Sequence, residues 1–322
     1  MPTNEYTQTN HTVLTDGILT GIWNLWAFIS LISVVVSLFV ILVILTDKKI
    51  RSKQFNKNIV GLVIPDLIFG TLCGIQCLTN SRHGMYYGGD MFCELQSVYV
   101  MSCISASIWM NLLISNEIYN LAKSTKTLNL KIQSSNRIII LQILLVYILC
   151  TLLGSLVLLI RFYDNDNTLQ HSQGLACLPK AYDSSSSLIF WILYILIVII
   201  VPLVIVAVRL HKTRKILMPS KVSVDCIRPH ETSNLKNTSK KIINMFTKLF
   251  IILLIMWVPT FLFIFVNHSL PYVTIIMGTW SHVQSFVPAF VYLNKKDIKK
   301  RVQYLIYGEN VESGVNLTSF LD

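Results

Sequence analysis

Seven long apolar stretches, separated by polar segments, divide this chain of 322 residues. They cover residues 22–46, 58–78, 95–117, 138–160, 187–208, 247–267 and 272–293. Each is about 20 residues or longer, the length that an α-helix needs to cross a ~30 Å hydrocarbon core. Because lipid offers no hydrogen-bond partners to the backbone, each stretch is predicted to be a transmembrane helix. The predicted fold class is an all-α integral membrane protein built as a bundle of seven helices.

The Lys and Arg residues fall in alternate gaps between these stretches. Of the 27 basic residues, only Arg82, Arg161 and Lys180 lie in gaps on the side of the N-terminus. The positive-inside rule therefore places the N-terminus outside the cell and the C-terminus in the cytoplasm. The net charge of +11 then reflects topology and contacts with anionic membrane lipid, not a nucleic-acid site. We expect a multi-pass protein of the cell membrane.

The polar ends of the chain divide into three further segments. Residues 1–21 are predicted to form an extracellular tail, in which Asn10 begins an Asn-x-Thr glycosylation sequon. The transmembrane domain covers residues 22–293. Residues 294–307 predict a short amphipathic helix on the inner membrane surface, because Ile298, Val302, Leu305 and Ile306 share one side of it. Residues 308–322 are expected to be a cytoplasmic tail.

The seven cysteines separate by their predicted depth. Four fall inside spans, where a thiol is usually a small apolar filler, namely Cys73, Cys77, Cys103 and Cys150. Cys226 is predicted to be cytosolic and reduced. Cys93, at the outer end of the third span, and Cys177, in the next outer loop, both face the oxidising side. With no other outer cysteine to compete, a Cys93–Cys177 disulfide is predicted.

Several local motifs occur in a fixed order along these spans. Residues 62–67 read Leu-Val-Ile-Pro-Asp-Leu, with the acid Asp66 inside the second span, and Tyr86, Gly89 and Cys93 follow in the first outer loop. Met256-Trp257-Val258-Pro259 lies in the sixth span, with Pro202 in the fifth and Pro288 in the seventh. This pattern, over residues 22–305, resembles a rhodopsin-like (class A) G-protein-coupled receptor. The resemblance implies an extracellular ligand, a heterotrimeric G-protein partner and no enzymatic activity.

The resemblance weakens at the inner ends of the helices. The family carries Asp/Glu-Arg-Tyr at the end of helix three, where this chain has Glu117-Ile118-Tyr119. The Asn-Pro-x-x-Tyr pattern of helix seven is altered around Pro288, and Tyr292 comes one residue late. With Trp257 and Pro259 in helix six, these residues form the predicted switch. Trp257 either transmits ligand contact or is simply a large core side chain.

The expected ligand pocket lies between helices three, five, six and seven. Its predicted lining is apolar and aromatic, the usual character of a small-molecule site, and comprises Gln96, Val100, Met101, Ile104, Trp257, Phe261, Ile264, Met277 and Trp280. Val100 stands where amine receptors carry an Asp, so a biogenic amine is disfavoured. Helix seven has no Lys to form a Schiff base with retinal. A peptide or a lipid-like molecule suits this lining better.

The outer rim carries more acids than bases. It balances Arg82, Arg161 and Lys180 against seven acids, Glu5, Asp16, Asp90, Glu94, Asp164, Asp166 and Asp183. An acidic rim draws in cationic ligands such as basic peptides. The alternative is an ordinary solvated surface.

Asp66 is the one acid deep within a span, and such a group is a functional hypothesis by default. The family resemblance implies a sodium ion held there, with Ser107 of helix three facing the acid. The alternative is a protonated Asp66 hydrogen-bonded to its neighbours. Otherwise the sequence suggests no cofactor.

The sequence shows no catalytic constellation and no metal-spaced His/Cys cluster, because the seven His residues are scattered along the chain. His282 and Gln284 in helix seven are either polar pocket residues or part of the helix packing. Two functions compete with the receptor. One is a non-signalling decoy, scavenger or scaffold, favoured by Glu117-Ile118-Tyr119. The other is a transporter, disfavoured because internal repeats and a polar pathway are missing. The oligomeric state is open.

Overall fold

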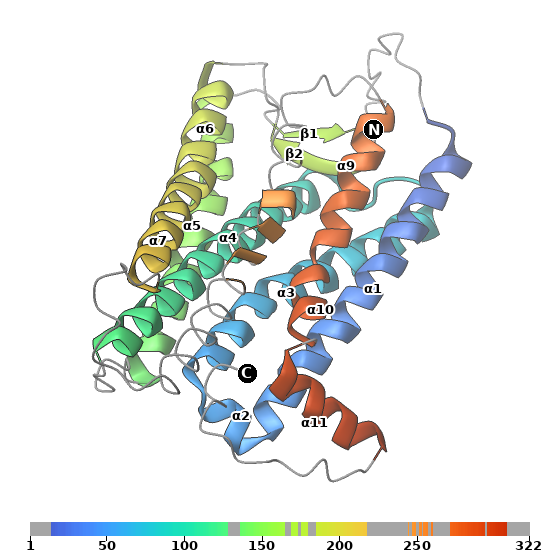
Figure 1. The fold of residues 1–322 in the computed structure, drawn as a ribbon. Helices are drawn as coiled ribbons and strands as arrows, with labels where there is room; N and C mark the ends of the chain where they lie inside the picture. Colours follow the sequence, from blue (N-terminus) through green and yellow to red (C-terminus); the bar gives the residue numbers. More distant parts are fainter. Residues whose placement is uncertain are drawn as a thin grey trace.

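The computed structural model describes residues 14–127, 136–164, 169–172, 175–179, 185–217, 271–293 and 295–307, together with nine positions between 244 and 259. The chain forms a bundle of long helices, with a two-stranded sheet at one end and two short helices at the other (Figure 1). The sheet marks the outer end of the bundle, because it belongs to the predicted second outer loop.

The first four spans are single helices. These are α1 (Asp16–Thr46), α3 (Gln54–His83), α4 (Gly89–Thr127) and α5 (Asn136–Asp164). All four are longer than their apolar stretches, because the helices continue into polar sequence beyond the membrane. The short helix α2 (Lys48–Ser52) follows α1, and the Asp47 side chain caps it by accepting hydrogen bonds from the backbone N–H groups of Lys49 and Ile50.

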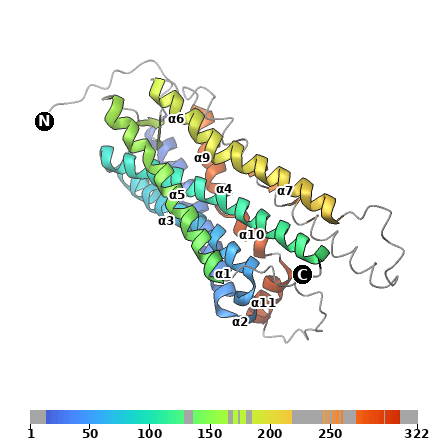
Figure 2. The same cartoon turned by 90° about the vertical axis from the view of Figure 1, so that its left-hand side faces the viewer.

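The fifth span is one rod made of α6 (Ser185–Ile195), a π-helical turn (Leu196–Ile200) and α7 (Val201–Leu217), as Figure 2 shows. Pro202 has no N–H to donate to the preceding turn, so the regular i→i−4 pattern cannot continue there. Just before it, Val201 donates to the carbonyl of Leu196. The wider π turn thus accommodates the proline without breaking the rod.

The seventh span is interrupted. Helix α9 (Pro271–Gln284) ends in a turn at Ser285 and Phe286, and α10 (Val287–Leu293) continues from it. In this turn the N–H groups of Ser285 and Phe286 donate to carbonyls three residues back. Pro288 explains the break, because it cannot donate to the carbonyl of Gln284.

Five of the described helical rods are long and apolar enough to cross a membrane, counting α6 to α7 as one. The seventh span does not qualify because of its break. In the sixth span the described positions from Asn244 to Pro259 are helical. The most apolar windows of α3 and α4 are 56% buried, whereas that of α5 is 22% buried. Helices α3 and α4 therefore form the centre, and α5 presents leucines and isoleucines to lipid.

The sheet joins β1 (Leu169–Ser172) to β2 (Ala176–Pro179). The strands are antiparallel, with Leu169 opposite Pro179 and His171 opposite Cys177. We call these two strands the outer sheet. It lies at the outer end of α4, at the end of the bundle opposite α2 and α11 (Lys296–Tyr307) (Figure 1).

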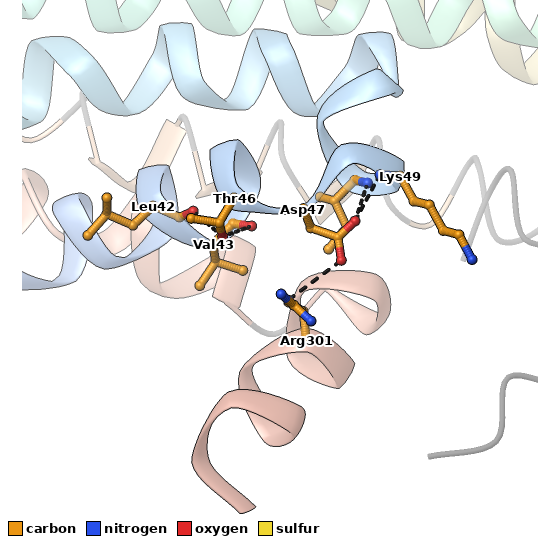
Figure 3. Close-up of polar contacts among 7 residues, drawn as sticks. Leu42, Val43, Thr46, Asp47, Lys49 and Arg301 are labelled. Atoms are coloured by element: carbon orange, nitrogen blue, oxygen red, sulfur yellow. Dashed lines mark hydrogen bonds and ion pairs between the residues drawn. The ribbon is translucent and has the colours of Figure 1, made fainter. Parts of the chain in front are cut away.

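Helix α11 is the predicted amphipathic helix. Ile298 is fully buried and Val302 packs beside it on the inner ends of α1, α3 and α4. Its polar side is anchored as well, because Arg301 pairs with the α2 cap Asp47 at 3.5 Å (Figure 3). The preceding Lys295 donates to the Asn56 side chain at 2.7 Å.

Candidate ligand pocket and helix switch

The predicted disulfide is confirmed. Cys93, in the second turn of α4, is bonded to Cys177 in β2, with 5.1 Å between their Cα atoms. Three hydrogen bonds hold the same strand region in place. The N–H of Cys177 donates to Gln96 Oε1 at 2.8 Å, Ser97 Oγ donates to the carbonyl of Cys177 at 3.2 Å, and Trp23 Nε1 donates to the carbonyl of Leu175 at 3.3 Å. The outer sheet is therefore attached to both α4 and α1.

A relay of polar side chains lies beneath the outer sheet. Tyr99 donates to Gln76 at 2.9 Å, Gln76 donates to Tyr86 at 2.6 Å, and Tyr86 donates to Gln96 Oε1 at 2.9 Å. Burial raises the pKa of Tyr86, so this hydroxyl remains a donor at physiological pH. Gln96, predicted to contact ligand, thus has its side-chain oxygen engaged by the backbone of Cys177. It positions the outer sheet.

Four of the predicted pocket residues pack in one apolar cluster. Met101, Ile104, Met277 and Trp280 gather with aromatic residues of α6, and we call this the middle cluster. Tyr194 of α6 ties it to α4, because its hydroxyl donates to the carbonyl of Met101 at 2.9 Å. Val100 belongs to a neighbouring cluster that faces α1 and α3. Trp257, Phe261, Ile264 and the sequon residue Asn10 lie outside the described residues.

Trp280 links the seventh span to the sixth. Its indole Nε1 donates to the backbone carbonyl of Met256 at 3.1 Å. Pro259, which is helical and partly buried, comes three residues later in the sixth span. A ligand that displaces Trp280 would therefore change a contact of the sixth helix close to its proline.

The ion site predicted around Asp66 lies next to a small cavity. The Asp66 carboxyl faces Ser107. Its Oδ2 has no hydrogen-bond partner among the residues that the structure describes. The cavity of about 20 Å³ is lined by Asp66, Phe69, Cys103, Ile104, Ser281, Gln284 and Ser285, and it has room for one water molecule or ion. These oxygen donors fit a hard cation such as sodium.

In the inner half of α4, the middle residue of the triplet Glu117-Ile118-Tyr119 is built into apolar packing. Ile118 is 1% exposed and lies in a cluster that also holds Leu62, Leu210 and Tyr292, which we call the inner cluster. Tyr119 lies beneath the guanidinium of Arg209 on α7, 4.6 Å from it. At the position where the family places an arginine, this chain therefore has a packed aliphatic side chain.

The structure also brings together residues that the sequence left apart. Cys73, Cys77 and His282 form a buried group with their ligand atoms close together. No motif scan along the chain could find it, because His282 is 205 positions away from Cys77. Arg209 was missed as well, since its partner Tyr119 is on another helix.

A long central α3–α4 pair, a disulfide-bound outer sheet and an interrupted seventh span fit a seven-transmembrane helix bundle. The family model for the 7 transmembrane receptor (rhodopsin family) matches residues 36–292. The chain belongs to this family. The predicted seven-helix membrane fold is confirmed, and so is the expectation of a receptor, not an enzyme.

Among solved structures, the chain is similar to squid rhodopsin. The TM-score is 0.76 at 12% sequence identity, over 95% of this chain and 89% of that one. A comparison with curated proteins found no match. At this identity the likeness to squid rhodopsin concerns the fold alone.

Proposed function

We propose that this receptor resides in the cell membrane, detects an extracellular peptide or an apolar small molecule, and signals to heterotrimeric G proteins. The observation that supports this best is the middle cluster, where Met101, Ile104, Met277 and Trp280 pack below the attached outer sheet. Apolar and aromatic side chains of this kind suit contact with a ligand that has an apolar part. Val100 offers no carboxylate to a biogenic amine.

The switch in this proposal is a shift between two populations of helix arrangements. The ligand would favour the arrangement that suits its own contacts in the middle cluster. Trp280 connects that cluster to the carbonyl of Met256, and Pro259 gives the sixth helix a bend about which its inner end can move. A sodium ion between Asp66 and Ser107 would favour one of the two arrangements.

Coupling to the G protein is proposed to be atypical. An arginine at the inner end of helix three would be a mobile charged contact, but Ile118 is 1% exposed in the inner cluster. Arg209 is an arginine on α7 beside this triplet, and it is partly buried against the Tyr119 ring. It could take the part of the missing helix-three arginine. The G protein would then meet Arg209 and the basic inner loops.

The same burial of Ile118 favours a second candidate, a decoy or scaffold that binds ligand without signalling. The deciding measurement is nucleotide exchange on a panel of purified heterotrimeric G proteins, with the full chain reconstituted in lipid nanodiscs. The wild-type chain is compared with Ile118→Arg, Ile118→Leu and Arg209→Gln. Ile118→Leu is the matched control, because it keeps volume and apolarity.

Exchange is measured without ligand and with each peptide or lipid that raises Tm. Under the receptor proposal the wild-type chain and Ile118→Leu accelerate exchange on at least one G protein in one of these conditions, and Arg209→Gln reduces that rate. If only Ile118→Arg accelerates exchange, the chain is a decoy. The melting temperature Tm of each variant is measured as a folding control. A buried unpaired charge, as in Ile118→Arg, costs several kcal/mol and can unfold the inner cluster.

The ligand class is tested separately by screening basic peptides, lipids and amines for a rise in melting temperature Tm of the purified chain. We expect peptides or lipids to raise it, and Trp280→Ala to reduce that rise. The control Val204→Ala changes a side chain that is 55% exposed toward lipid and should leave the rise unchanged. Stabilisation by amines alone would contradict the proposed ligand class.

A further inference from the structure

Two thiols and an imidazole meet inside the helix bundle, outside the middle cluster and beside the Asp66 cavity, with which they share the neighbour Phe69. Cys73 and Cys77 lie one turn apart on α3, so they project from the same side of the helix. His282 lies on α9. Cys73, Cys77 and His282 are 4%, 4% and 2% exposed. Their sulfur and nitrogen ligand atoms all lie within 4.8 Å of one another.

The distance between the Cys73 sulfur and the His282 nitrogen is close to that in a tetrahedral zinc site. Bonds of about 2.3 Å to sulfur and about 2.0–2.1 Å to nitrogen at tetrahedral angles separate the sulfur and nitrogen by roughly 3.6 Å. Cys73 Sγ lies 3.7 Å from His282 Nε2. These two ligands need no backbone movement to share one ion.

The imidazole is already turned toward the thiols. Ser30 Oγ on α1 lies 3.0 Å from His282 Nδ1. When Nδ1–H donates to this hydroxyl, the lone pair of Nε2 points to the thiols, and metal-bound histidines in proteins are held by the same kind of contact. The rings of Trp26 and Phe69 lie 5.1 Å and 5.7 Å from the imidazole and confine it.

Two glycines of α3 allow Ser30 to come this close. A Cβ on Gly74 would lie 3.2 Å from Ser30 Cβ, and a Cβ on Gly70 would lie 3.4 Å from the Ser30 carbonyl oxygen. Small residues at such positions let transmembrane helices approach one another. The support for His282 is thus built into the contact between α1 and α3.

The charges favour a soft divalent cation. Each thiol would lose its proton to solvent on binding, and two thiolates with one neutral imidazole would cancel the charge of Zn²⁺. A neutral complex is tolerated in an apolar interior, where a net charge is costly. Thiolate and imidazole ligands also select zinc over magnesium or calcium. Among the described residues no other His, Cys, Asp or Glu joins the group, so a fourth position is left for water or a ligand.

We propose that Cys73, Cys77 and His282 bind one Zn²⁺ ion, which joins α3 to α9. The ion stabilises the arrangement in which its ligands are together, and it therefore acts on the helix that carries Trp280. Cys77 is six residues from the outer end of α3 at His83, about 9 Å along the helix axis. The extracellular side is the closer source of the ion.

The test uses the full purified chain in nanodiscs without reductant, which keeps the Cys93–Cys177 disulfide closed, and Cd²⁺ as the spectroscopic probe. We expect an ultraviolet thiolate-to-cadmium charge-transfer band that saturates at one ion per chain and is displaced by Zn²⁺. A saturating Zn²⁺ concentration, about a hundredfold above Kd, should raise Tm by roughly 5 °C or more.

Variants assign the ligands. The double change Cys73→Ser and Cys77→Ser should abolish the band, and Ser30→Ala should weaken affinity about 10–100-fold, the usual effect of removing such a supporting contact. The matched controls Cys103→Ser and Cys150→Ser each remove a thiol of the bundle that is outside the group, and both should keep the band. The metal-free Tm of every variant is compared with that of the wild-type chain.

A measurement on the unaltered chain covers the case in which a variant does not fold. Zn²⁺ should protect Cys73 and Cys77, identified by mass spectrometry, from alkylation, and should leave Cys103 and Cys150 unchanged. The proposal is overturned by equal labelling with and without Zn²⁺, by a band that survives the double substitution, or by a Cys73–Cys77 disulfide in the purified chain. None of these readouts requires signalling.

Discussion

Gly154 on α5 is expected to tolerate no side chain at all. A Cβ built there would lie 2.1 Å from Ser102 Oγ, 2.8 Å from Ser102 N and 2.9 Å from the carbonyl oxygen of Val98 on α4. Rotation of the serine relieves only the first overlap, because the other two atoms belong to the backbone. Ordinary contact begins near 3.4 Å, so Gly154→Ala forces α4 and α5 apart by roughly half an ångström.

Two opposing free-energy contributions decide whether Gly154→Ala stabilises or destabilises the folded chain. Overpacking of this kind costs about 1–3 kcal/mol, and replacing a helical glycine with alanine returns up to about 1 kcal/mol. The net loss is up to about 2 kcal/mol, which at about 2–4 °C per kcal/mol lowers Tm by up to about 8 °C. The matched control is Gly21→Ala on α1, where a Cβ meets nothing within 4 Å and only the helix gain remains.

The assay is thermal unfolding of the purified chain in detergent and in nanodiscs. We expect Gly154→Ala to lower Tm and Gly21→Ala to leave it unchanged or raise it slightly. If both variants had the same Tm, the close approach of α4 and α5 would be refuted.

Two further predictions concern the ends of the bundle. Cys177→Ser should remove about 2–4 kcal/mol of stability and lower Tm, and treatment of the wild-type chain with reductant should have the same effect; an unchanged Tm in both would show that the hydrogen bonds from Gln96 and Ser97 suffice. Arg301→Gln should cost about 1 kcal/mol, because the contact to Asp47 is long at 3.5 Å, although the two side chains, 28% and 23% exposed, are only partly screened by solvent. Hydrogen exchange should quicken in α11 alone, whereas the exposed Lys299→Gln should leave exchange unchanged.

The features that the sequence predicted correctly are those that leave a clear pattern of residues along the chain. Span lengths and the asymmetry of the basic residues indicated the fold and its orientation. The disulfide followed from compartment alone, because Cys93 and Cys177 were the only cysteines on the oxidising side. The amphipathic helix followed from the spacing of Ile298 and Val302, both of which pack on the bundle.

The features that the sequence did not reveal depend on contacts between helices. Gln96 has polar chemistry that suits a ligand, yet its oxygen accepts from the backbone of Cys177, and no pattern along the chain reports that partner. The sequence could not connect His282 to Cys73, because that contact depends on which side of α9 faces α3. The site residues of the ligand pocket and the ion site remain predictions.

The outer sheet is attached to α4 firmly enough to be ordered before a ligand binds. The main chain around Cys177 is fixed by a covalent bond and by hydrogen bonds to Gln96 and Ser97 before any ligand binds. A molecule that touches this strand loses no affinity to ordering it. The proposed extracellular ligand would therefore meet a strand that is already rigid on the side of α4.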